Sequence, residues 1–152
     1  MTDSPPALTE SAPKAHFNPD TAMIDNLDPK QAWALLQDNP AAVLIDVRTA
    51  IEHGFVGHPP KAIHVAWKEF PGMQLNTSFV EQVQQHAPDK TAPILLLCRS
   101  GVRSVEAAKA LEAAGYQHLV NILEGFEGPL DDDKHRGNLG GWRFHDLPWE
   151  QS

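Results

Sequence analysis

The most constraining feature of the chain is a run of apolar residues that ends abruptly in a polar loop. Ala92 to Cys98 reads APILLLC, and the segment from Gly101 to Gly115 follows with the spacing of a helix. A strand that is apolar without interruption is buried on both faces, which is typical of a parallel sheet covered by helices. This stretch therefore predicts an α/β fold.

Strand and helix patterns alternate along the rest of the chain in the same way. A helix is expected from Pro29, with Asp28 as its N-cap, and Asn39-Pro40 is expected to end it. The remaining expected elements are a helix within 76–89 and strands at 42–47, 62–67 and 118–122. This order predicts βαβ units in a central parallel sheet with helices on both faces, and function at the carboxyl ends of the strands.

Length and charge narrow the class of protein. The 152 residues suit one domain, and we expect it to span 21–152 behind a mobile, Pro- and Ser-rich tail over 1–20. The formal net charge of −8 argues against nucleic acid and anionic membrane as partners, although one local pocket can still be positive. The sequence shows no membrane-spanning run, no secretory signal and no coiled-coil pattern, and it has one cysteine. We expect a cytoplasmic monomer without disulfides.

That one cysteine, Cys98, ends the strongest predicted strand and is followed by RSGVRS. Gly101 permits an unusual backbone angle, so the loop can direct several N–H groups towards one point near the helix start. Arg99 and Arg103 add full positive charges. These features favour the nucleophilic thiolate of Cys98, and the alternative interpretation is an inert cysteine of the core.

Several segments, in order along the chain, resemble the rhodanese (thiosulfate sulfurtransferase) family. CRSGVRS at 98–104 resembles the active-site loop, and LIDVR at 44–48 resembles a strand that ends in Asp-Val-Arg. EHGFVGHPPKAIHV at 52–65 resembles the segment with an acid, Gly-His and an alanine, and LEGFEG followed by GWRFHDLPW resembles the closing pattern. The resemblance covers about residues 20–150. It implies a rhodanese-like α/β fold with about five parallel strands and a persulfide on the loop cysteine.

The resemblance also implies a double displacement that needs no metal and no organic cofactor. Cys98, the catalytic residue, takes the outer sulfur of thiosulfate or of a persulfide donor and passes it to cyanide, a thiol or a protein acceptor. The arginines would attract the anionic donor. The expected substrate-binding residues are Arg99, Ser100, Gly101, Val102, Arg103 and Ser104.

Asp46, Arg48 and His58 are expected to support this site. Asp46 and Arg48 lie either at the pocket edge or in an internal pair, and pairing is favoured because an acid within a buried strand needs a partner. His58 is expected to form structural hydrogen bonds, since attack by a thiolate needs no general base. Lys61 replaces a glycine of the family pattern, so a positive φ there would cost about 1 kcal/mol.

Residues 129–140 lengthen the connection between the last strand and the closing tryptophan, and they are a candidate wall of the pocket. The run Asp131–Asp133 lacks the alternating acids and the distal glutamate of a calcium loop, so a solvated acidic patch is expected. The eight histidines show no metal-binding spacing, and no metal site is expected.

Two other functions stay open. A persulfide carrier or partner-docking module with little small-molecule turnover would use the same cysteine. A phosphatase or arsenate reductase of related fold is less favoured. It needs an arginine six positions after the cysteine, where this chain has Ser104.

Overall fold

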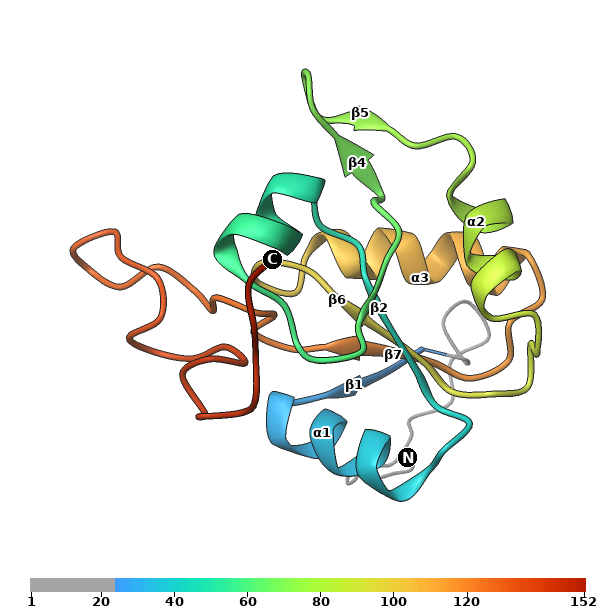
Figure 1. The fold of residues 1–152 in the computed structure, drawn as a ribbon, viewed down its shortest axis with the longest axis horizontal. Helices are drawn as coiled ribbons and strands as arrows, with labels where there is room; N and C mark the ends of the chain where they lie inside the picture. The colour runs from blue at the N-terminus through green and yellow to red at the C-terminus, as the bar shows by residue number, and fades with distance from the viewer. Residues whose placement is uncertain (1–23) are drawn as a thin grey trace, which may run out of the picture.

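The computed structural model describes residues 24–152, and its centre is a parallel sheet of five strands (Figure 1). The strands lie in the order β1-β7-β6-β2-β3. Their bounds are Ile24–Leu27 (β1), Val43–Asp46 (β2), Ile63–His64 (β3), Ile94–Leu97 (β6) and Leu119–Ile122 (β7). The predicted α/β class is confirmed, whereas the predicted tail over 1–20 lies outside the described residues.

Helices cover both faces of the sheet. The helix α1 (Pro29–Asp38) lies on one face, and α2 (Phe79–His86) and α3 (Arg103–Ala113) lie on the other (Figure 1). The central strand β6 therefore supplies two cores, with Ile94 and Leu96 in the α2–α3 core and Leu95 and Leu97 in the α1 core. This double burial explains why the strand is apolar at every position. Within residues 24–152, every helix falls short of the length and apolar character that a membrane crossing requires.

The start of α1 follows the prediction. Asp28 accepts a hydrogen bond from the Gln31 N–H at 2.8 Å, and the Gln31 side chain accepts from the Asp28 N–H at 3.0 Å. This reciprocal capping box satisfies two N–H groups at the helix start, and Pro29 has no N–H to satisfy. The helix ends before Asn39, as predicted.

The strand predicted over 62–67 is shorter than expected. Only Ile63–His64 pairs with β2 as a regular strand. Beyond it, the Val65 N–H still donates to the Asp46 carbonyl at 3.1 Å, and the Trp67 N–H donates to the Val47 carbonyl at 2.9 Å. The chain then forms an antiparallel hairpin, β4 (Lys68–Glu69) and β5 (Gln74–Leu75), that projects from the body of the fold (Figure 1). The hairpin was not predicted.

The connection from β2 to β3 contains a short π-helix, η1 (Glu52–Val56), which was not predicted either. Gly57 ends it with a φ of 122°, a conformation that side chains rarely adopt. The C-terminal segment binds this connection, because His58 and Glu150 exchange two backbone hydrogen bonds of 2.8 Å. η1 is thus held between the sheet and the C-terminal segment.

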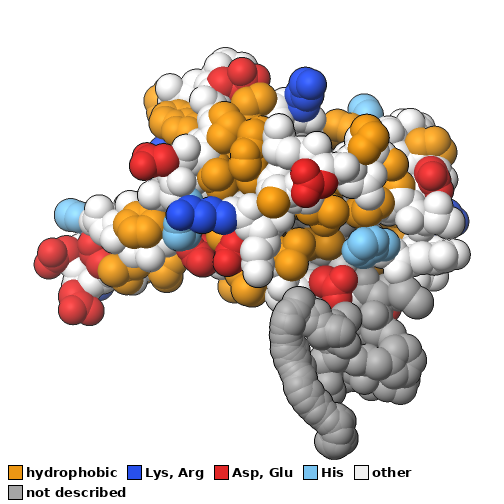
Figure 2. Space-filling model, turned by 90° about the horizontal axis from the view of Figure 1, so that it is seen from below, with side chains coloured by type: hydrophobic (Ala, Val, Ile, Leu, Met, Phe, Trp, Pro, Cys, Tyr) orange, Lys and Arg blue, Asp and Glu red, His pale blue; other side chains and the backbone are white. Residues whose placement is uncertain are grey.

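Residues 129–140 form a lobe that extends from the body at the left of Figure 1, and Figure 2 shows acidic side chains gathered at its tip. Asp131 is more than a solvated charge. It accepts hydrogen bonds from the N–H groups of Asp133 and His135 and from the amide of Asn138, at 2.7–2.9 Å. The bond from Asn138 and those from the backbone hold the pKa of Asp131 below its ordinary value. The run predicted as a solvated patch therefore also organises its own loop.

Candidate active site

Cys98 lies directly after β6, at the carboxyl edge of the sheet, and is 1% exposed. Its Sγ accepts a hydrogen bond from the Gly101 N–H at 3.0 Å and lies 3.3 Å from Oγ of Ser104. The Ser104 hydroxyl also donates to the side-chain oxygen of Asn121. Because Ser104 has one hydroxyl proton, it can serve either Asn121 or a Cys98 thiolate at one time. The sulfur therefore has one backbone donor and one switchable donor.

The loop after β7 fixes the backbone around Cys98. The Cys98 carbonyl accepts from the Phe126 N–H at 2.8 Å, and the Arg99 carbonyl accepts from the Glu127 and Gly128 N–H groups at 3.0 and 3.2 Å. Gly125 makes this approach possible, since a Cβ there would lie 2.5 Å from the Cys98 carbonyl oxygen. Gly101 itself has a φ of 99°. Two glycines therefore allow the close packing of the cysteine loop.

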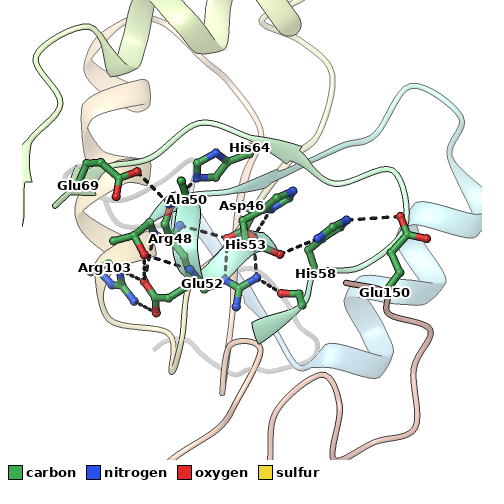
Figure 3. Close-up of polar contacts among 12 residues, drawn as sticks. Asp46, Arg48, Ala50, Glu52, His53, His58, His64, Glu69, Arg103 and Glu150 are labelled. Carbon is green, nitrogen blue, oxygen red and sulfur yellow. Dashed lines mark hydrogen bonds and ion pairs between the residues drawn. The ribbon is translucent and has the colours of Figure 1, made fainter. Parts of the chain in front are cut away.

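Arg103, at the first position of α3, is paired with an acid. Its guanidinium donates to both carboxylate oxygens of Glu52 at 2.9 and 2.8 Å, and Thr49 adds bonds from its N–H and hydroxyl to the same carboxylate (Figure 3). Burial disfavours the charged form of both side chains. The hydrogen bonds between them have the larger effect, so the pKa of Glu52 is lowered and the pKa of Arg103 is raised relative to their ordinary values. The positive charge of Arg103 is therefore largely balanced.

A pocket of about 820 Å³ opens beside the cysteine loop. Its lining comprises Ile51, Glu52, Lys68, Phe70, Met73, Cys98, Arg99, Ser100, Val102, Arg103, Glu127 and Arg136. Four cationic side chains and two carboxylates are among them, in a protein of net charge −8. The local surplus of positive charge agrees with the expectation of a positive pocket, and Cys98 is placed where an anion would be attracted.

Asp46 and Arg48 form a pair away from this pocket. Two hydrogen bonds of 2.8 and 2.7 Å join them, both side chains are fully buried, and the Arg48 guanidinium also donates to the carbonyl of Gly57 (Figure 3). Burial alone would raise the pKa of Asp46. Hydrogen bonds from His53 and Arg48, with the charge of Arg48, lower it to about 2. The pairing interpretation agrees with this geometry, and the pair anchors the end of η1.

His58 lies in the same network and not in the pocket lining. Its Nδ1 is 2.7 Å from the His53 carbonyl, and its ring stacks on the His53 ring at 3.9 Å between centroids. On the other side its Nε2 is 3.4 Å from the Glu150 carboxylate (Figure 3). These contacts support the expected structural hydrogen-bonding role.

Most of the predicted binding residues meet at one place. Arg99, Ser100, Val102 and Arg103 line the pocket with Cys98. Gly101 acts through its N–H, and Ser104 is fully buried behind the sulfur.

The pocket lining also contains residues outside the predicted site: Ile51, Glu52, Lys68, Phe70, Met73, Glu127 and Arg136. Glu52 was noted only as part of the family resemblance, and its pairing with Arg103 spans 51 positions. Lys68 and Arg136 come from the unpredicted hairpin and from the lobe. Arg136 belongs to the segment 129–140, which was predicted as a candidate wall of the pocket, whereas no local pattern in the sequence points to Lys68 or to the pairing of Glu52.

Comparisons with known proteins agree with this geometry. The family model described as "Rhodanese-like domain" matches residues 28–128. The crystal structure of Rv0390 from M. tuberculosis is 40% identical, with a TM-score of 0.77 over 84% of this chain and 98% of that one. The uncharacterized protein RC0915 of Rickettsia conorii is 36% identical over 133 residues, 84% of this chain and 98% of its own length. Thiosulfate sulfurtransferase GlpE of Haemophilus influenzae is 29% identical over 102 residues, 67% of this chain and 84% of its own length.

Proposed function

The chain belongs to the rhodanese-like domain family, and from that membership we propose that it is a sulfurtransferase in which Cys98 carries a sulfane sulfur as a persulfide. The observation that carries the proposal is the position of the Cys98 sulfur. It is buried, it accepts a hydrogen bond from the Gly101 N–H, and it lines a pocket rich in cationic side chains. Such surroundings suit a thiolate and then the anionic end of a persulfide.

In the first step the Cys98 thiolate attacks the outer sulfur of thiosulfate. A new S–S bond forms on Cys98, the S–S bond of thiosulfate breaks, and its electron pair leaves with sulfite. Arg99, which is exposed at the pocket and has no ion pair within residues 24–152, attracts the dianion and the leaving sulfite. Before the attack, Ser104 can turn its hydroxyl towards the Cys98 thiolate.

In the second step an acceptor thiolate or cyanide attacks the outer sulfur of the Cys98 persulfide. The acceptor becomes a persulfide or thiocyanate, and the electron pair of the broken S–S bond returns to Cys98 as the thiolate. No second cysteine exists in the chain to intercept the sulfur, so the acceptor must come from outside. The proposed reaction needs no metal and no organic cofactor, and we further propose that the protein is a cytoplasmic monomer.

The test is intact mass measured before and after incubation with thiosulfate, followed by a cyanide chase. We expect the gain of one sulfur atom, its removal by cyanide, and neither change in Cys98→Ala. Circular dichroism of the variant checks that the fold is retained. A folded protein with a free thiol that gains no sulfur from thiosulfate would contradict the proposed donor.

A second candidate, a carrier loaded by a partner protein, is favoured by the apolar surroundings of the pocket. Ile51, Phe70 and Val102 line it and are 61%, 54% and 69% exposed. Exposed apolar side chains around a reactive group are typical of a contact surface for another molecule. Comparing the loading rate from thiosulfate with that from a persulfidated cysteine desulfurase distinguishes the two, because a carrier would load much faster from the protein.

A further inference from the structure

The pocket is much larger than a sulfur oxyanion needs, and two segments away from the cysteine loop build its outer part. Its volume of about 820 Å³ lies in the range of pockets for organic molecules. Lys68, Phe70 and Met73 come from the hairpin, and Arg136 comes from the lobe over 129–140. The lining thus extends beyond the group that reacts at Cys98.

Arg136 is held as a binding side chain would be. Its Nη1 donates to the Gly128 carbonyl at 2.8 Å, which fixes the guanidinium at the base of the lobe. Within residues 24–152 it has no carboxylate partner, in contrast to Arg103 and Arg48, which are each paired with an acid. A guanidinium has five N–H donors, so Arg136 keeps free donors beside the pocket.

The other charges of the pocket leave this guanidinium available. Glu52 is engaged by Arg103, and Lys68 forms an ion pair with Glu106 at 3.8 Å. Glu127 is the one other carboxylate of the lining, set against Arg99 and Arg136. The net charge of the side chains in the outer part of the pocket is therefore positive.

We propose that Arg136, together with Arg99, forms an anion subsite that selects a small organic thiol bearing a carboxylate as the sulfur acceptor. The inference rests on the proposed function. The apolar lining residues Ile51, Phe70 and Val102 contact the carbon chain of the acceptor, while the guanidinium binds its carboxylate. The acceptor thiolate then attacks the outer persulfide sulfur, leaves with it as an organic persulfide, and releases the Cys98 thiolate.

The experiment uses protein whose Cys98 persulfide has been formed with thiosulfate, confirmed by mass and freed of donor. Single-turnover loss of the sulfur is timed with 3-mercaptopropionate and with the neutral thiol 2-mercaptoethanol. In Arg136→Gln we expect transfer to 3-mercaptopropionate at subsaturating thiol to slow about tenfold, the loss of one charged hydrogen bond. Transfer to 2-mercaptoethanol should stay within about twofold, because that thiol does not use the guanidinium.

The matched control is Lys134→Gln. It removes the same charge from the same lobe, but its side chain is exposed and does not line the pocket. It should leave both rates unchanged. Equal slowing of both thiols in Arg136→Gln, or equal effects of the two variants, would overturn the subsite and leave the sulfurtransferase proposal intact. A wild-type protein that never forms the Cys98 persulfide would overturn the proposed function and this inference with it.

Discussion

The N–H that donates to the Cys98 sulfur belongs to a residue whose conformation only glycine adopts without strain. Gly101 has a φ of 99°, and a Cβ there would lie 3.3 Å from the Glu124 N. In Gly101→Ala the loop must shift, and the bond to Cys98 Sγ shifts with it. We expect persulfide formation from thiosulfate to slow about tenfold or more, measured by timed intact mass.

Gly115→Ala is the control for this change. Gly115 also has a positive φ, 100°, but it lies at the far end of α3 with ordinary contacts to Lys90. The variant carries a similar backbone strain and should load sulfur at the wild-type rate. Equal slowing in both variants would mean that backbone strain at any position slows sulfur loading, and that the hydrogen bond from the Gly101 N–H to Cys98 Sγ has no specific effect.

Lys61 shows backbone strain at a residue outside the lining of the Cys98 pocket. Its φ is 66°, and the Ala62 N–H donates to the Pro59 carbonyl at 3.2 Å, so Pro59 to Ala62 form a turn in which the third position favours glycine. Lys61 therefore has the positive φ for which the sequence analysis predicted a cost in stability. We expect Lys61→Gly to raise the free energy of unfolding by about 0.5 kcal/mol, since relief of the strain exceeds the added chain entropy.

Urea unfolding at neutral pH checks the change at Lys61, and Lys61→Ala separates its causes. The alanine variant also loses the charge and the long side chain but keeps the Cβ that causes the strain. Stabilisation by alanine as large as that by glycine would assign the effect to charge and not to backbone conformation.

At the scale of elements, η1 depends on a contact with the C-terminal segment. A Cβ on Gly57 would lie 2.8 Å from the Trp149 ring, in addition to the strain of a φ of 122°. We expect Gly57→Ala to destabilise the fold by more than about 2 kcal/mol, measured by urea unfolding. Trp149→Ala removes the obstructing ring. The double variant Gly57→Ala/Trp149→Ala should therefore be about 1 kcal/mol more stable than the sum of the two single effects. Strict additivity would show that the ring is not what opposes the new methyl group.

The same scale shows what could be predicted from sequence. β6, α1 and the cysteine loop were predictable because their signals are local: an unbroken apolar run, an N-cap aspartate followed by proline, and small residues before a helix. β1 was not, since its four residues, IDNL, have no strand-like alternation and gain their place only by pairing with β7. The partner of Arg103 was equally hidden, because Glu52 lies 51 positions away in the chain, at the start of the unpredicted η1.

At the scale of the whole molecule, an acidic protein holds a positive pocket. The net charge of −8 is spread over the chain, whereas Lys68, Arg99 and Arg136 converge from three separate segments. Charges beyond a Debye length of about 8 Å are screened at physiological ionic strength, so a small anion at the pocket responds to the nearby cations. Composition therefore predicts only the net charge of the whole surface, and the positive charge of the pocket depends on how the fold brings these segments together.

The stability of the whole fold should fall at low pH because of its most buried ion pair. The pKa of Asp46 is about 2 in the folded protein against an ordinary 3.8. A carboxyl with a lowered folded pKa stabilises the fold above its unfolded pKa, and the contribution is lost as the pH falls through the folded value. For Asp46 this amounts to about 2 kcal/mol, fully present above about pH 5 and lost between about pH 4 and pH 2. Glu52 acts in the same direction, since its pKa is also lowered.

Urea unfolding from pH 6 to pH 2 measures this loss, and the variant Asp46→Asn/Arg48→Met assigns it. Replacing both partners avoids leaving a buried arginine without its acid, which would cost about 3–5 kcal/mol. The double variant should be less stable than the wild type at pH 6, and the difference should shrink by about 2 kcal/mol as the pH falls to 2, because only the wild type loses the pair. A difference that stays constant over this range would mean that Asp46 keeps its ordinary pKa in the fold. The acid sensitivity would then have to come from other carboxylates, such as Glu52.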